Sequence, residues 1–364
     1  MIKKKKLGKH VNGEDIIQYT LTNENGIEVK ILNYGAIIQA INLPLPTKKK
    51  NIVLGFDDYK EYLTDEYKAN CPYFGATVGR IAGRVKNGEL YCDGRVTQLN
   101  CNEGKNHLHG GNEGLDKKIW NFHSSDDDSL SLKYISEDGE ENYANRLEVY
   151  VTFKFLKNNK FAIYYEARAD KPTAANITNH TYFNLSNKKN TIDHNVTLRA
   201  EEYLVTDENN IHTGEIKSVE GRLDLSKDKT LAETMEGKGY DTTFYNSDKY
   251  PYFNIMLWSA DTNIRVEIDS ISPCLQLYTG EYIKTKKHGK YSGIAIESMN
   301  VPYLPLHFNN LKYSKNNPFR SIITYHFYYP GDGTKEYYKE KFEEYCKERN
   351  MMDKEEEEER KFLP

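Results

Sequence analysis

Long apolar runs are missing from this sequence of 364 residues, and so are paired cysteine motifs. No stretch approaches the roughly 18 apolar residues that a membrane-spanning helix requires, and the basic start of the chain is not followed by the apolar stretch of a secretory signal. The five cysteines are an odd number without a C-x-x-C spacing, which argues against a disulfide framework and a zinc site. We therefore expect a reduced, soluble, cytoplasmic protein with no membrane partner.

A large net charge is also lacking. The chain has 50 Lys and Arg against 54 Asp and Glu, a formal charge of -4, which gives no general attraction for nucleic acid. Hydrophobic residues make up only 38%, below the ~45–50% of typical globular chains, but aromatic residues reach 12%. Disordered chains are poor in aromatics, so we expect a folded, tyrosine-rich body. We also expect the protein to act as a monomer or weak dimer.

Alternation of apolar and polar residues dominates the chain. In the clearest case, a hairpin at residues 147–167, Val149, Val151 and Phe153 alternate with polar residues ahead of a polar turn at 157–160. Similar alternation predicts strands at residues 27–32, 36–43, 254–260, 263–268, 274–278 and 321–329. The sequence shows neither an internal repeat nor a strand–helix–strand rhythm. It therefore predicts an all-β fold, one large antiparallel β-sandwich over residues 1–330.

Residues 331–364 follow a different pattern. Tyr337, Tyr338, Phe342 and Tyr345 recur near helical spacing, and residues 355–359 are an unbroken run of glutamates. This pattern predicts a short, helical and acidic C-terminal extension. A solvated helix with a frayed end is the simpler interpretation, and a partner-binding tail is the alternative.

Two histidine-containing segments are candidates for chemistry. Residues 179–185 place His180 beside a phenol and two amides, and residues 107–111 place His107 and His109 on one side of a strand-like stretch that ends in two glycines. A His-x-His pair is compatible with a metal ion. The first carboxylate that follows, Glu113, lies beyond the glycine pair, so we expect no metal.

Two further segments combine glycine or apolar residues with charge. Residues 74–84 are glycine-rich and carry two arginines, but they lack the Lys-Ser/Thr ending of a phosphate-binding P-loop. Residues 293–297 are an apolar strand that ends in Glu297. A carboxylate there is costly to desolvate unless the site uses it, and the alternative is a strand-end glutamate that reaches solvent.

With these motifs in their order along the chain, the sequence resembles the galactose mutarotases, or aldose 1-epimerases. The resemblance runs from about Gly13 to Tyr329 and includes residues 33–36, 53–56, 72–77, 108–111, 179–185 and 276–280. It implies a large antiparallel β-sandwich. It also implies an enzyme that interconverts the α and β anomers of free hexoses such as galactose and glucose, with no cofactor.

The resemblance assigns roles to six residues. Glu297 matches the family's general base and His180 its general acid, and the sugar-binding residues correspond to Arg84, His109, Asp241 and Gln276. Ring opening needs a base for the proton of the C1 hydroxyl and an acid for the ring oxygen. We hypothesise that Asp241 and Glu297 keep His180 protonated. No function is expected of the remaining histidines, which are His10, His107, His123, His194, His212, His288, His307 and His326.

The chain departs from the family pattern in three places. Gly83 stands where the family usually has asparagine, residues 298–304 differ from the family's loop after the base, and the tail beyond about Tyr329 lies outside the pattern. Two other functions stay open. A non-catalytic sugar-binding or regulatory protein would not need both His180 and Glu297, and a hexose-phosphate mutarotase would need a basic cluster that the sequence does not place.

Overall fold

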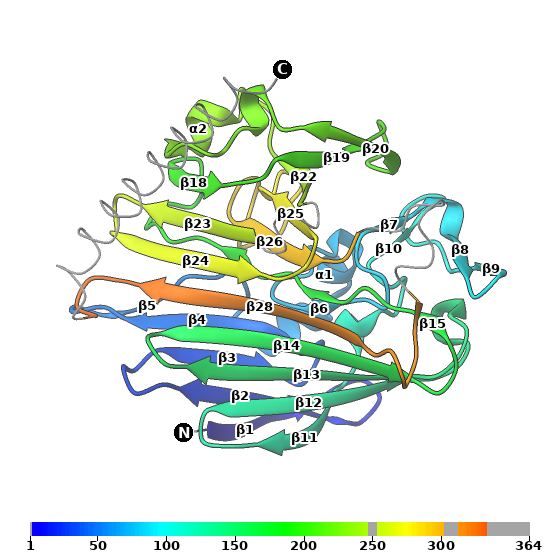
Figure 1. Cartoon of the computed structure of the whole chain (residues 1–364). Helices are drawn as coiled ribbons and strands as arrows, with labels where there is room; N and C mark the ends of the chain where they lie inside the picture. The colour runs from blue at the N-terminus through cyan, green and yellow to red at the C-terminus, as the bar shows by residue number, and fades with distance from the viewer. Residues whose placement is uncertain (1, 247–252, 302–311, 333–364) are drawn as a thin grey trace.

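Antiparallel strands make up most of the computed structural model, which describes residues 2–246, 253–301 and 312–332 (Figure 1). The predicted all-β antiparallel fold is confirmed. The predicted helical extension falls, from residue 333 on, outside the described residues, and the division of the chain at residue 330 stays a prediction. Within the described ranges, no helix is long and apolar enough to cross a membrane.

The largest sheet has nine strands in the order β11-β12-β13-β14-β28-β24-β23-β18-β21. Their bounds are β11 (Asn121–Ser125), β12 (Ser129–Ser136), β13 (Leu147–Leu156), β14 (Lys160–Ala169), β28 (Phe319–Tyr328), β24 (Ile264–Ser270), β23 (Phe253–Ser259), β18 (His194–Leu198) and β21 (Lys229–Thr230). Every strand predicted above from alternation is present within a few residues of its expected bounds.

Two smaller sheets lie on one side of the nine-stranded sheet in Figure 1. The five-stranded sheet contains β1 (Ile2–Lys9), β2 (Asp15–Thr22), β3 (Glu28–Leu32), β4 (Ile38–Pro44) and β5 (Lys49–Asn51). The six-stranded sheet has the order β17 (Tyr182–Phe183), β26 (Ile294–Met299), β25 (Cys274–Tyr278), β22 (Asp241–Tyr245), β19 (Glu202–Thr206) and β20 (His212–Ser218).

Short elements connect these sheets. The two-stranded pairs are β10 (His107–Leu108) with β7 (Arg84–Val85), β15 (Thr173–Ala174) with β27 (Lys312–Tyr313), β16 (Thr178–Asn179) with β6 (Thr77–Val78), and β8 (Glu89–Cys92) with β9 (Arg95–Gln98). The helices of the described residues are α1 (Asp65–Asn70), α2 (Leu231–Thr234) and the 3₁₀ turns η1 (Tyr59–Leu63), η2 (Lys86–Gly88), η3 (Leu115–Lys117), η4 (Glu140–Asn142) and η5 (Gly221–Leu223).

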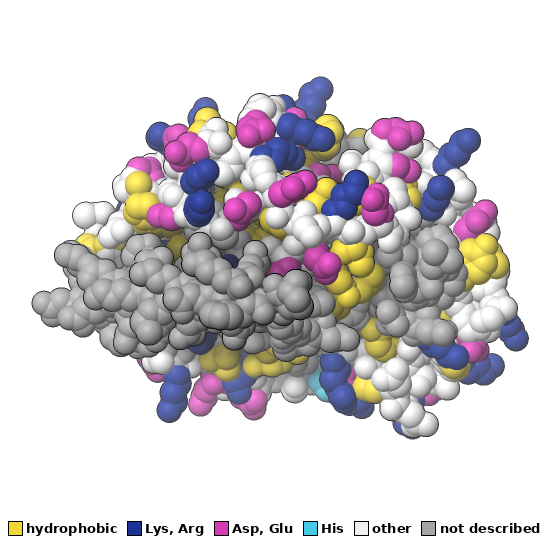
Figure 2. Space-filling model, turned by 45° about the horizontal axis from the view of Figure 1, so that its top comes forward, with side chains coloured by type: hydrophobic (Ala, Val, Ile, Leu, Met, Phe, Trp, Pro, Cys, Tyr) yellow, Lys and Arg dark blue, Asp and Glu magenta, His cyan; other side chains and the backbone are white. Residues whose placement is uncertain are grey.

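The β13–β14 hairpin shows why the pattern gives this fold. Alternate side chains of β13 are fully buried, and those between them are partly exposed, as expected for a strand with one buried face. Asn158 and Asn159 connect the strands with positive φ angles of 60° and 57°, which suit the right-handed twist of a hairpin. Acidic and basic side chains are mixed over the face drawn in Figure 2, in line with the small net charge.

Alternation in the six-stranded sheet positions the functional site. Ile294 and Ile296 of β26 and Leu275 and Leu277 of β25 belong to the main hydrophobic core, which all three large sheets share. The residues between them point to the other face of the sheet, because successive side chains of a strand alternate. Glu297 therefore stands on the face away from the core.

The first arginine of the glycine-rich segment, Arg80, is structural. Its guanidinium is almost completely buried and donates to Ser136 Oγ at 2.8 Å and to the carbonyl oxygens of Ser136 at 2.8 Å, Asn145 at 2.8 Å and Glu137 at 3.0 Å. Buried carbonyl groups that lose their donor are costly. This side chain therefore ties the loop after β12 to the segment that leads to the site.

Replacing Arg80 by Met should lower the free energy of unfolding by about 3 kcal/mol or more, because several buried carbonyl groups lose their donors together. Denaturant unfolding measures the loss. Arg95→Met, at an exposed position, is the matched control and should change stability by less than about 0.5 kcal/mol. Equal stability of the two variants would contradict the role given to Arg80.

Candidate active site

A cavity of about 430 Å³ opens on the face of the six-stranded sheet that points away from the core. Its volume lies within the ~300–1,000 Å³ of small-molecule sites. All six predicted site residues line it, which are Arg84, His109, His180, Asp241, Gln276 and Glu297. Segments up to about 200 residues apart in the sequence therefore meet at one site.

Strand register brings His180 and Glu297 together. β17 pairs antiparallel with β26, with Tyr182 opposite Ala295 and Phe183 opposite Ile294. The pairing begins at Tyr182, and the same register continued by two residues sets His180 opposite Glu297. His180 lies two residues from Tyr182, and Glu297 lies two residues from Ala295. Because side chains of a strand alternate between its faces, His180 and Glu297 point to the same side of the sheet as that pair.

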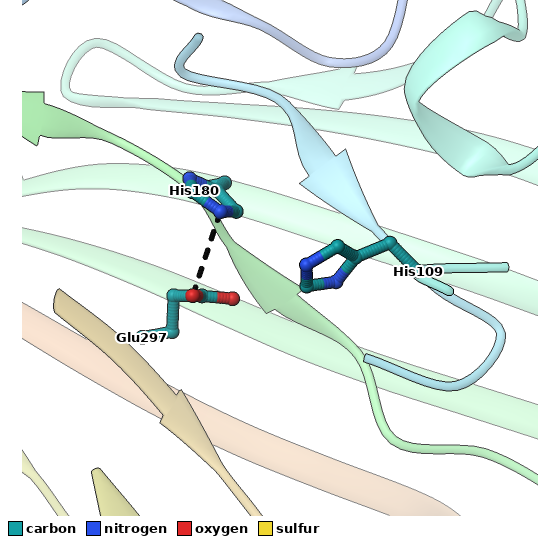
Figure 3. A group of neighbouring side chains, drawn as sticks. All are labelled: His109, His180 and Glu297. Atoms are coloured by element: carbon teal, nitrogen blue, oxygen red, sulfur yellow. Dashed lines mark ion pairs between the residues drawn. The ribbon is translucent and has the colours of Figure 1, made fainter. Parts of the chain in front are cut away.

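The two side chains are close and almost completely buried. His180 Nε2 lies 3.5 Å from Glu297 Oε1, and the side chains are 5% and 3% exposed. Figure 3 shows both pointing toward one another, with His109 beside them. Within the described residues, the other polar atoms, His180 Nδ1 and Glu297 Oε2, are buried and have no hydrogen-bond partner. The atoms that face each other are therefore Nε2 and Oε1.

Burial moves the pKa values of this pair in opposite directions. Desolvation lowers the pKa of His180 to about 4. It raises the pKa of Glu297 to about 8, with a further increase from Asp241 and a decrease from Arg84. The hypothesis that nearby carboxylates keep His180 protonated is therefore wrong for the free protein. At neutral pH the imidazole is neutral and the carboxyl group holds the proton.

His109 has a fixed protonation pattern. The backbone N–H of Gly83 donates to His109 Nδ1 at 3.2 Å, so the proton of the neutral ring must lie on Nε2. Burial, followed by His180 and Arg84, lowers the pKa of His109 well below its usual value. His109 can therefore donate a hydrogen bond from Nε2.

His107 does not share this site. Its Nδ1 bonds the carbonyl oxygen of Asn100 at 2.7 Å and its Nε2 bonds the Tyr143 hydroxyl at 2.6 Å. The expectation that His107 and His109 lie on one side of a strand is wrong, because β10 ends at residue 108 and His109 has a positive φ of 49°. Both ring nitrogens of His107 are therefore bonded within the protein, away from the cavity.

The ligand atoms of His109, His180 and Glu297 all lie within 4.8 Å of one another, close enough for a metal ion. The chemistry of the set does not fit. A histidine that binds a metal through one nitrogen ordinarily donates from the other. His109 Nδ1 instead accepts from Gly83, which leaves a protonated Nε2.

Arg84 is clamped by a residue that the sequence analysis missed. Its Nε and Nη2 donate to Glu103 Oε2 and Oε1 at 2.7 and 2.8 Å, a bidentate pair. Leu108 pairs with Arg84 between β10 and β7, and Glu103 lies in the turn just before β10. In the sequence, the only signal for the Arg84–Glu103 pair would have been a turn that brings the segment around residue 103 back against Arg84. The clamp orients the guanidinium along the cavity wall.

Asp241 and Gln276 form a second polar pair. Gln276 Nε2 donates to Asp241 Oδ1 at 2.6 Å. Burial raises the pKa of Asp241, and Arg84 and this hydrogen bond act against that increase. The pair offers a ligand both hydrogen-bond acceptors and donors on one wall of the cavity.

Aromatic rings hold the imidazoles in place. Tyr73 stacks on His180 with ring centres 5.7 Å apart and meets His109 edge-on at 4.8 Å. The ring of Tyr182, at the start of β17, has its centre 4.8 Å from that of His180. The available signal was the place of Tyr182 two residues after His180, and the place of Tyr73 within the segment 72–77 that carries the family resemblance.

Two of the departures from the family pattern lie at the cavity. Gly83 lines it, and a Cβ added there would meet no atom within 4 Å. The glycine therefore leaves open space where the family usually has a side chain. After Glu297, Met299 lines the cavity, and residues 302–304 lie outside the described residues.

The sequence and the fold of this chain are similar to those of known proteins. The family model for aldose 1-epimerase matches residues 18–315. An aldose 1-epimerase of Haemophilus influenzae is 31% identical over 304 residues, 79% of this chain and 87% of that protein, and a galactose mutarotase of Sus scrofa is 33% identical over 306 residues, 80% and 87%. The crystal structure of a galactose 1-epimerase from Lactobacillus acidophilus superimposes with a TM-score of 0.80 at 27% identity, over 91% of this chain and 99% of that one.

The chain belongs to the aldose 1-epimerase family and is an isomerase.

Proposed function

We propose that this protein interconverts the α and β anomers of free hexoses, galactose and glucose among them, by acid–base ring opening. The observation that carries the proposal is the buried contact of His180 Nε2 with Glu297 Oε1 at 3.5 Å in the wall of a sugar-sized cavity. Arg84, Asp241 and Gln276 would bind ring hydroxyls. The relatives named galactose mutarotase support the substrate class.

In the proposed reaction, Glu297 takes the proton of the C1 hydroxyl and His180 gives a proton to the ring oxygen. The C1–O5 bond breaks, C1 becomes an aldehyde, and the C1–C2 bond rotates before the ring closes on the other face. Opening leaves Glu297 protonated and His180 neutral, and closing returns both protons. The pair therefore passes between two arrangements of one proton, without net exchange with solvent.

The proton must first move from Glu297 to His180. Burial favours the neutral arrangement in the free protein. The Arg84 guanidinium lowers the pKa of Glu297, and hydroxyl groups of a bound sugar would solvate the charged arrangement. We infer that sugar binding shifts the proton to His180.

The charges of the cavity favour a neutral sugar. Among the described residues that line it, Arg84 is the one lysine or arginine, and both oxygens of Glu103 already bind its guanidinium. The carboxylates of Glu103 and Asp241 line the same space, beside the protonated carboxyl group of Glu297. A phosphate group would meet repulsion there, so the hexose-phosphate alternative is disfavoured. Binding alone would not require the buried acid–base pair, which argues against the non-catalytic alternative.

We also propose that the protein acts in the cytoplasm. The cysteines of the described residues, Cys71, Cys92, Cys101 and Cys274, are all free thiols, which suits a reducing compartment. Its action as a monomer or weak dimer stays a prediction.

Replacing Glu297 by Gln should lower kcat for α-D-galactose by about 10²–10⁴-fold, because an amide cannot take the proton of the C1 hydroxyl. KM should change less than about threefold, since the side chain keeps its size. Polarimetry on freshly dissolved sugar measures both parameters.

Glu281→Gln is the matched control, because Glu281 lies on the loop that connects β25 to β26 and pairs with Lys290 at 2.8 Å. It should keep the activity of the natural chain. Near-normal turnover of Glu297→Gln would remove Glu297 from the reaction, and no turnover by the natural chain on any free hexose would reject the proposed function.

The rate should depend on pH through the proton of the pair. Above about pH 8 the pair loses its proton, no acid remains for the ring oxygen, and the rate falls. Below about pH 4 the pair gains a second proton, no base remains, and the rate falls again. Polarimetry corrected for the spontaneous reaction gives the profile. A rate that stays constant well above pH 8 would contradict this account.

A further inference from the structure

The cavity wall formed by the six-stranded sheet contains a chain of hydrogen bonds that the proposed reaction does not use. Register places Thr243 opposite Gln276 and Gln276 opposite Glu297, so these three side chains stand in a row on one face. Asp241, two residues before Thr243, points to the same face. Hydrogen bonds connect this row to His212 at the start of β20.

The amide of Gln276 is bonded at both ends. Its Oε1 accepts the hydroxyl proton of Thr243, and its Nε2 donates to Asp241 Oδ1 at 2.6 Å. A primary amide has two N–H donors. The second N–H of Gln276, which lines the cavity, is therefore left for a ligand.

The direction of this chain starts at Asp241, whose carboxylate can only accept, so the Nε2 end of the Gln276 amide faces Asp241 and the Oε1 end faces Thr243. A threonine hydroxyl can donate or accept, so Thr243 alone suits either orientation of the amide. His212 Nε2 lies 3.4 Å from Thr243 Oγ1. Because the hydroxyl gives its only proton to Gln276, its oxygen must accept from the Nε2–H of His212.

The protonation of His212 agrees with this direction. Burial, and then the charge of Arg84, lowers the pKa of His212 to about 4, so the ring is neutral near pH 7 and carries one proton. Within the described residues, His212 Nδ1 is buried and has no hydrogen-bond partner. The contact with Thr243 is thus the hydrogen bond that places the proton on Nε2.

We propose that His212 and Thr243 are positioning residues, which orient Gln276 so that it presents an N–H, and not its carbonyl oxygen, to the substrate. This inference rests on the proposed function and extends it. The sugar hydroxyl beside Gln276 is recognised through its oxygen. A deoxy sugar without that oxygen leaves the N–H unpaired and binds more weakly.

The first test compares Thr243→Val with Thr243→Ser. Valine keeps the shape but removes the hydroxyl, so the amide loses its fixed orientation, and KM for galactose should rise about 3- to 10-fold with kcat within about twofold. Serine restores the hydroxyl and should return KM to within about twofold of the natural value. An unchanged KM in Thr243→Val, or an equal rise in Thr243→Ser, overturns the proposal.

The second test needs no turnover. NMR of the chain with ¹⁵N-labelled histidine should show the proton of His212 on Nε2, with the signals assigned by their loss in His212→Phe. A proton on Nδ1 overturns the proposal. If the natural chain fails to interconvert galactose anomers, the proposed function is rejected, while this measurement still reports whether the hydrogen-bond chain exists.

Discussion

The chemistry of this site depends on the burial of two ionisable groups against each other. His180 and Glu297 share almost no contact with solvent and face each other across 3.5 Å. In such surroundings each group resists its charged form, so the pKa of the acid rises and that of the imidazole falls. One proton on the pair is then the stable state over a wide pH range, and the proposed ring opening begins from the arrangement in which His180 holds that proton.

The fold supplies this contact through register. In an antiparallel pair of strands, the pairing of one residue fixes which residue lies opposite each of its neighbours. The pairing of Tyr182 with Ala295 thereby places His180 beside Glu297. The same strands turn their other face to the core. A slip of one residue would move Glu297 to the apolar face, so the packing of the core and the contact of His180 with Glu297 require the same register.

Much of the fold could be predicted from the sequence, because strands with one buried face leave a period of two. The short pairs β6–β16 and β7–β10 carry too few residues for a period, so their partners could not be read. His107 shows the limit, since a single positive φ at His109 separates two rings that strand periodicity would place together. The expectation of a protonated His180 failed because burial, which depends on tertiary packing, lowers the pKa of His180 to about 4.

The six predicted site residues meet in one cavity. Their motifs marked His109, His180 and Glu297 as candidates, but only the family resemblance gave them roles and selected Asp241 and Gln276. Glu103, Thr243 and His212 act on other side chains, and nothing in their sequence neighbourhood indicates those partners. Their roles depend on which strands lie side by side, and a single sequence does not specify that order.

The most direct measurement is the infrared difference spectrum between the natural chain and Glu297→Gln near neutral pH. The account predicts the carbonyl band of a protonated, buried carboxyl group in the natural chain only, and its loss as the pH rises through about 8. A carboxylate band at Glu297 near neutral pH would contradict the shared proton on which the account depends.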